Sequence, residues 1–211
     1  STRDWSSDVC SSDLAVHARQ DPVLMALILS KMTFAIGTGI VSQLAVLASD
    51  VYGGGDGARG ILIAARGVGV GLGPLIAMKY TGSDLSRVLK VCGLSSLGFC
   101  VCYLIGIWQP YLAVAVVFVT LGHLGGGAQW TLSSFGVQMR SPDEMRGRII
   151  AGDFAMMTMV MSVTTTVVGI LSDTIGVRPA MSIFAAAAAV ASVVYLNATR
   201  PLRRELAASR E

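Results

Sequence analysis

The feature that most constrains this chain is a series of six long apolar runs separated by short polar segments. The runs cover residues 23–48, 60–78, 88–107, 112–138, 149–171 and 180–197. Each could cross about 30 Å of hydrocarbon as a helix, and backbone groups in lipid must be satisfied within the segment, which favours helices over strands. Only 14% of the residues are charged, too few to cover a water-facing surface. The sequence therefore predicts an all-α membrane protein with six transmembrane helices.

Residues 1–14 differ sharply from the rest, because they are polar and contain the near-repeat SSDV and SSDL. The string DWSSDVCSSDL resembles the translation of a common short-read sequencing adapter, with Leu14 completing the last codon. We therefore expect residues 1–14 to be a non-native segment that takes no defined fold and makes few contacts with the helices. The alternative is a genuine disordered tail. On the first interpretation, the chain is a fragment whose N-terminal part is missing.

Lysine and arginine are distributed unevenly between the two sides of the predicted bundle. One side holds eleven: Arg19, Lys79, Arg87, Lys90, Arg140, Arg146, Arg148, Arg200, Arg203, Arg204 and Arg210. The other side holds only Arg59 and Arg178. Because basic loops stay in the cytosol, we expect a cytosolic lead-in at 15–22, a six-helix unit at 23–198 and a cytosolic tail at 199–211. Both ends of the chain are then cytosolic.

Glycines cluster in the second and fourth runs, in the strings RGVGVGLGP and GHLGGG. Pairs four residues apart, Gly69 with Gly73 and Gly122 with Gly126, predict close helix packing; bending points for a transporter are the alternative. The GxGxGxG string does not indicate a dinucleotide site, because that fingerprint follows a strand. The sequence shows no metal-ligand spacing and calls for no cofactor or nucleic acid.

Three ionisable residues lie inside apolar runs, namely Lys31, Arg66 and Asp153. A charge in lipid is costly unless it is paired or wet, so each is a candidate functional residue. Arg66 and Asp153, close to the ends of their runs, could instead reach the interface. In the fourth run, His123, Gln129 and Trp130 could line a polar cavity, or form hydrogen bonds between helices.

Two connecting segments carry patterned residues. In RSPDEMRGR, Ser141 with Glu144 has the spacing of a capping box and Pro142 suits a first helical position, which predicts a short helical entry to the fifth run. Arg146, Gly147 and Arg148 complete this segment. The string GILSDTIGVR contains Gly169, Asp173, Gly176 and Arg178. On the outer side, Asp173 is expected to cap a helix or pair with Arg178.

These strings together resemble the C-terminal half of a major facilitator superfamily transporter, of the bacterial drug and siderophore exporter branch. The resemblance rests on AARGVGVGLGPLIA, GGGAQWTLSSFGVQM and PDEMRGRIIAGDFAM, and covers residues 15–205. It departs from the superfamily's best-known loop signature, because the similar string with Asp173 lies in the last loop instead of a cytosolic one. The resemblance implies half of a twelve-helix bundle in a bacterial cytoplasmic membrane, built from inverted three-helix repeats around a midplane site.

The family resemblance also places the first and fifth helices of the half side by side. Counted along the helices at 1.5 Å per residue, Lys31 and Asp153 have compatible depths. We therefore expect them to form an ion pair or to share a small wet polar site, with Asp153 as a candidate proton carrier. The expected function is proton-coupled efflux of a hydrophobic or amphipathic small molecule, with no covalent chemistry. The expected partners are the lipid bilayer, the substrate and the missing N-terminal half.

A complete six-helix membrane protein is the alternative to this transporter half. It could be a scaffold, or an intramembrane enzyme such as a rhomboid-like protease. GHLGGG resembles the histidine helix of those proteases, and the nearest serine string, GLSS, ends at Ser96. A protease would require Ser96 and His123 within hydrogen-bonding distance.

Overall fold

The computed structural model of the protein describes residues 20–209 and contains six helices long and apolar enough to cross a membrane. This confirms the predicted all-α membrane fold. The spans are Pro22–Val51, Gly55–Thr81, Leu85–Gly106, Leu112–Arg140, Arg146–Ile175 and Val177–Ala198. From the second onward they are helices α4 to α8, and a further helix, α9, covers Arg200–Ala208. The suspected adapter segment, residues 1–14, lies outside the described residues.

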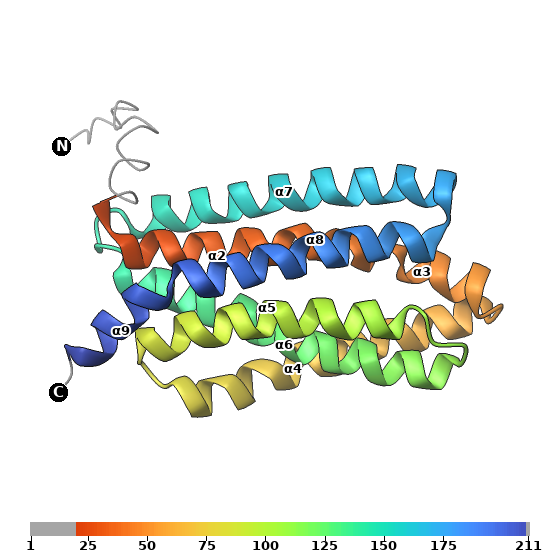
Figure 1. Ribbon diagram of the computed structural model, residues 1–211, viewed down its shortest axis with the longest axis horizontal. Helices are drawn as coiled ribbons and strands as arrows, with labels where there is room; N and C mark the ends of the chain where they lie inside the picture. Colours follow the sequence, from red (N-terminus) through yellow and green to blue (C-terminus); the bar gives the residue numbers. More distant parts are fainter. Residues whose placement is uncertain (1–19, 210–211) are drawn as a thin grey trace, which may run out of the picture.

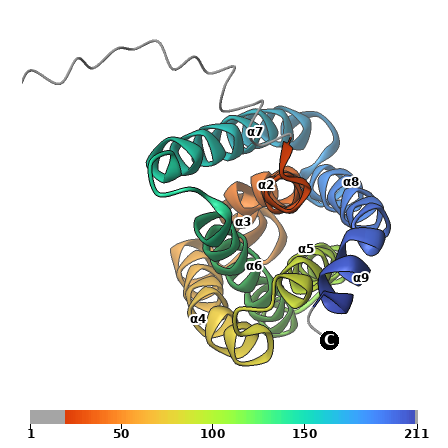
Figure 2. The ribbon, with the colours of Figure 1, turned by 90° about the vertical axis from the view of Figure 1, so that its left-hand side faces the viewer.

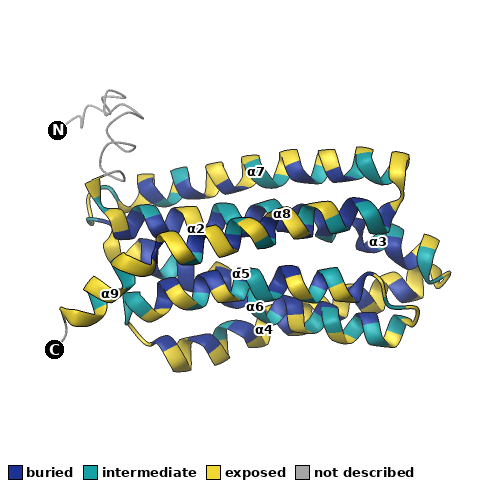
Figure 3. Ribbon diagram, viewed as in Figure 1, coloured by how far each residue is buried: buried dark blue, intermediate teal, exposed yellow. Residues whose placement is uncertain are grey.

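Two helices form the centre of the bundle and two others form its flanks. Figure 2 shows α2 and α6 next to each other, with α7 and α4 on their outer sides and with α8 and α5 to the right of them. In the first span, 67% of the most apolar window is buried, against 28% in α4 and 17% in α7. Figure 3 shows the corresponding exposed surface along α7 and α4. The flanking helices therefore present wide apolar faces to the surroundings.

The first span is not a continuous α-helix. Helix α2 (Pro22–Thr38) is followed by a 3₁₀ segment η1 (Gly39–Gln43), a single α-turn α3 (Leu44–Val46) and a π-helical turn η2 (Leu47–Val51). The change of winding begins at Gly39, where a Cβ atom would lie 2.8 Å from the backbone carbonyl carbon of Thr164 in α7. The glycine therefore permits a close backbone approach between the first and fifth spans.

Close packing of α4 on α6 depends on glycines, as the spacing predicted. A Cβ atom at Gly73 would overlap the carbonyl oxygen of Leu124, and one at Gly127 would lie 2.5 Å from the carbonyl oxygen of Val70. Gly69 faces the backbone of α6 in the same way. Of the predicted pair in α6, Gly126 faces the ring of Phe34 instead. The glycines thus act as packing surfaces, and α4 stays helical through them.

The described chain begins and ends at the same end of the bundle (Figure 1). That end carries nine of the described lysines and arginines, and the opposite end carries only Arg59 and Arg178. The predicted cytosolic tail contains helix α9. Its Leu202 and Leu206 pack against the buried cluster around Val88 and Tyr195. Hence α9 is attached to the bundle and is not a free extension.

Candidate functional site

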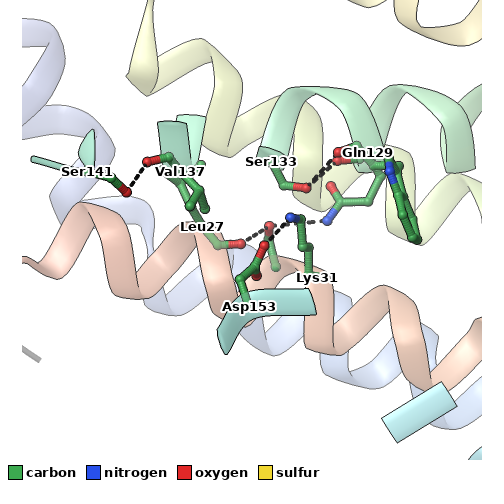
Figure 4. A network of polar contacts seen from close by, with 9 residues as sticks. Leu27, Lys31, Gln129, Ser133, Val137, Ser141 and Asp153 are labelled. Carbon is green, nitrogen blue, oxygen red and sulfur yellow. Dashed lines mark hydrogen bonds and ion pairs between the residues drawn. The ribbon is translucent and has the colours of Figure 1, made fainter. Parts of the chain in front are cut away.

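A buried ion pair joins the first and fifth spans. Lys31 Nζ of α2 donates to Asp153 Oδ2 of α7, and both side chains are almost fully inaccessible (Figure 4). At 1.5 Å per residue, Lys31 lies about 14 Å from the start of α2 and Asp153 about 11 Å from the start of α7. Both helices start at the same end of the bundle. The predicted pair is therefore confirmed, and its members lie inside their spans.

Two buried acceptor atoms in the region of this pair have no hydrogen-bond partner among the described residues. Gln129 of α6 is fully buried, and its Nε2 donates to Ser30 Oγ at 3.1 Å (Figure 4). Gln129 Oε1 and Asp153 Oδ1 are buried without a hydrogen-bond partner among the described residues. Since buried acceptors normally find a donor, this region has spare capacity for a proton or a water molecule. Gln129 thus belongs to the ion-pair region and not to the cavity.

A separate cavity of about 300 Å³ lies between four spans. Its walls come from the first span, α4, α6 and α7, and are lined by Phe34, Thr38, Arg66, Val70, His123, Gly126, Gly127, Trp130 and Met161. Of the candidate site residues, the structure therefore brings together Arg66, His123 and Trp130 at this cavity. Aromatic and aliphatic walls with a few polar groups are typical of small-molecule sites.

Arg66 is the cationic group of this cavity. Helix α4 begins at Gly55 and not near residue 60, so Arg66 lies about 16 Å from its start at 1.5 Å per residue. The helix therefore extends about five residues beyond the predicted start of the apolar run, and the side chain of Arg66 is exposed. Among the described residues, Arg66 has no ion pair and no hydrogen bond. An unpaired guanidinium at this depth requires water, an acceptor or an anion.

His123 has a mixed role, because its ring both packs and lines the cavity. Its Nδ1 lies 3.0 Å from the carbonyl oxygen of Val119 and 3.5 Å from Tyr103 Oη. The ring also packs edge-on against Phe99, with centroids 5.4 Å apart. Its position is thus fixed by its own helix and by α5, and it presents a fixed imidazole to the cavity.

Two aromatic rings connect the cavity to the ion pair. Trp130 packs edge-on against Phe154, with centroids 5.6 Å apart, and Lys31 Nζ lies 5.2 Å from the centre of the Phe154 ring. Sequence reasoning missed Phe154, although its position next to Asp153 was a usable signal. A ligand that displaces Trp130 would disturb the surroundings of Lys31 through this contact.

The segment between α6 and α7 differs from its prediction. Ser141 Oγ donates to the carbonyl oxygen of Val137 at 2.6 Å, which caps the end of α6 and leaves α7 without a side-chain cap. Residues 142–145 form a turn, so the predicted capping box with Pro142 and Glu144 and the helical entry are wrong. Arg146 begins α7 and pairs with Asp143, while Gly147 and Arg148 are exposed.

Replacing Arg146 and Arg148 together with Gln should reduce correct insertion of the chain, since each cation near a membrane surface contributes about 1 kcal/mol. A reporter enzyme fused to the C-terminus would report the side reached. The single variant R59Q, at the opposite end, is the control. Unchanged topology together with unchanged activity of the double variant would exclude a role for both arginines.

Arg178 holds together the turns at the opposite end of the bundle. Its Nε donates to the carbonyl oxygen of Ile107 at 2.7 Å and its Nη2 to that of Gln109 at 3.0 Å. Tyr52 Oη donates to the same Gln109 oxygen at 3.2 Å. The expected role of Asp173 is wrong: it lies exposed within the last turns of α7, and neither caps a helix nor pairs with Arg178.

The two glycines of this outer string have different positions. Gly169 lies within α7, where a Cβ atom would lie 3.8 Å from Nε2 of Gln43. Gly176 ends α7 and precedes α8 directly, with φ of 91°, a conformation that side chains other than glycine rarely adopt. The sharp α7–α8 corner therefore depends on Gly176.

The protease geometry is absent from the described residues. Ser96 Oγ accepts a hydrogen bond from Ser192 Oγ at 2.9 Å, and no hydrogen bond connects Ser96 with His123.

Comparison with protein-family models, with curated proteins and with solved structures finds no match for this chain.

Proposed function

We propose that the chain is the C-terminal six-helix half of a major facilitator transporter that moves an amphipathic small molecule in exchange for protons. The observation that carries this proposal is the arrangement of Arg66, His123 and Trp130 around one cavity inside the spans, connected through Phe154 to the Lys31–Asp153 pair. A binding site and a protonatable group in contact with each other are the minimum that coupled transport requires.

The neighbour relations of the helices support this proposal. In the first three spans and the last three, α2 corresponds to α6, α4 to α7 and α5 to α8. Helix α4 packs on α6, and α7 packs on α2 in the same way. Helix α5 packs on α6, α8 packs on α2, and α5 and α8 pack on each other. Exchanging the first three spans with the last three therefore preserves these contacts. Because α2 and α6 run in opposite directions, the relation is that of an inverted repeat, an architecture typical of secondary transporters.

The exposed flanks support a second half as partner. Helices α4 and α7 expose large apolar side chains along their length, among them Leu75, Ile76, Met159, Val163 and Ile170. Lipid alone could cover these faces. However, the cavity lies between the same two helices, so a second half seated on them would close it. The N-terminal half and the lipid bilayer would then share the surface of the bundle.

The proposed coupling proceeds through Asp153. Protonation of its carboxylate removes the negative charge that holds Lys31, and the unpartnered acceptors nearby can take up the released ammonium. Substrate in the cavity contacts Trp130, whose ring packs on Phe154 beside Lys31. Occupancy of the cavity and protonation of the pair can therefore influence each other. The uneven distribution of lysine and arginine supports an orientation in which the pair lies toward a bacterial cytosol.

The complete reading frame provides the most direct test of this proposal. Long-read sequencing of the locus should find six further hydrophobic spans in frame upstream of Ala15, and inverted vesicles containing the complete protein should show substrate-induced proton release. A start codon close to Ala15 would contradict the transporter half and leave a complete six-helix protein. A D153N variant that still couples protons would contradict the assigned carrier.

Replacing Arg66 with Gln should abolish selectivity for anionic amphiphiles. A matched probe set is 2-naphthoate, 2-naphthylmethanol and 2-naphthylmethylammonium, whose ring suits a cavity of about 300 Å³. Calorimetry on the complete protein should show the anion bound at least tenfold more tightly than the alcohol, and R66Q should remove this difference. R66K should retain part of it, since the charge stays but the bidentate fork is lost. Equal binding of all three probes would exclude the anion preference.

A further inference from the structure

Three cations without partners surround one hollow at the end of the bundle where the described chain begins and ends. The hollow has a volume of about 510 Å³ and lies among α5, α8 and α9, which Figure 2 shows side by side. Lys90 comes from α5, and Arg200 and Arg204 come from α9. All three are exposed, and within residues 20–209 none of them has an ion pair or a hydrogen bond.

Neighbouring polar groups define the site more closely. Arg203 is partly engaged by the backbone, because its Nη2 donates to the carbonyl oxygen of Leu196 at 2.6 Å at the end of α8. Ser86 Oγ donates to the carbonyl oxygen of Arg203 at 2.8 Å, which fastens α9 to α5. Within residues 20–209, the three cations and the Asn197 amide donate no hydrogen bond and line the hollow. Glu205 lies at the adjacent hollow, beside Arg200 and Arg204.

An apolar strip continues from this hollow toward the middle of the bundle. On α5, Leu94 lies one turn after Lys90 and on the same face of the helix. On α8, Val193 and Val190 lie one and two turns before Asn197 and share its face. These side chains are 48%, 44% and 64% exposed. Helices α5 and α8 pack against each other along this line, where Ser192 bonds Ser96.

We propose that this hollow and strip bind one anionic glycerophospholipid. Lys90, Arg200 and Arg204 bind the phosphodiester, and the acyl chains lie along Leu94, Val193 and Val190. A soluble phosphate would use the cations but not the strip, whereas a zwitterionic lipid would use the strip but gain less from the cations. Only an anionic lipid uses both. The inference requires the membrane fold alone and is independent of the proposed transport.

Native mass spectrometry of the detergent-purified chain tests this site with dioleoyl phosphatidylglycerol as probe. The variant R200Q/R204Q should weaken binding about 30-fold, since each cation contributes about 1 kcal/mol. The control R59Q/K79Q removes the same charge from α4 and should leave binding within about threefold. L94W/V193W should weaken binding by filling the strip without altering the charge. Dioleoyl phosphatidylcholine should bind more weakly than phosphatidylglycerol.

Each alternative predicts a different result. An equal loss in R59Q/K79Q would overturn the site in favour of diffuse attraction. Full competition by millimolar inorganic phosphate, or no effect of L94W/V193W, would overturn the lipid in favour of a soluble anion. If R200Q/R204Q lost its helical circular dichroism, K90Q on α5 would replace it, and unchanged lipid binding by a folded K90Q would contradict the assignment.

Discussion

Replacing either member of the Lys31–Asp153 pair should lower stability by about 3 kcal/mol, because the remaining charge is left buried without its partner. Replacing both should cost less than replacing either one, since a neutral pair leaves no charge to compensate. The variants are K31M, D153N and K31M/D153N. Thermal unfolding of the purified chain, followed by circular dichroism or by loss of the monomer peak in size-exclusion chromatography, would measure the three midpoints.

The matched control for this cycle is Arg140, which pairs with Asp21 at the end of the bundle and whose side chain is 41% exposed. R140Q should shift the midpoint little, because exposed ion pairs contribute at most about 1 kcal/mol. Additive effects of K31M and D153N would show that the two side chains do not interact. In the complete protein the same non-additivity should appear in transport, which connects the pair to coupling as well as to folding.

Replacing Gly73 with Ala should be among the most damaging single-methyl changes in the chain. The added Cβ would overlap the carbonyl oxygen of Leu124 and lie 2.9 Å from its carbonyl carbon. Backbone atoms cannot move aside as a side chain can, so α4 would have to separate from α6 at a cost of about 2 kcal/mol or more. The midpoint of thermal unfolding should fall clearly.

Gly71, two residues earlier on the same helix, provides the control. A Cβ atom there would meet no heavy atom within 4 Å, and Ala has the higher helix propensity by up to about 1 kcal/mol. G71A should therefore be neutral or stabilising. Equal destabilisation by G71A and G73A would mean that helix flexibility, and not the close approach to Leu124, explains these glycines.

The ion pair was predictable from sequence because lipid restricts the options for a charge. Lys31 and Asp153 could be placed in depth by the rise of a helix, and the resemblance supplied the lateral proximity. The start of the helix that carries Arg66 was placed too late, because the apolar run begins near residue 60 while the helix begins at Gly55. Hydropathy reports which residues suit lipid and does not report where the backbone stops being helical.

Local rules also failed where one residue can serve two elements. Ser141 follows α6 and precedes α7, and its hydroxyl can cap either helix; the structure assigns it to the carbonyl of Val137 in α6. The 3₁₀ segment at Gly39 coincides with a contact to Thr164, which is distant in sequence. Such choices depend on tertiary contacts that a single sequence does not display.

The outer junction at Gln109 has a consequence for how the sequence can change. Tyr52 and Arg178 both donate to the backbone carbonyl of residue 109, so three turns from distant parts of the chain meet at an atom that every amino acid possesses. Mutational drift at position 109 should therefore leave the junction intact. Substitutions of Tyr52 or Arg178 would break it, so the central residue is the one that is free to vary.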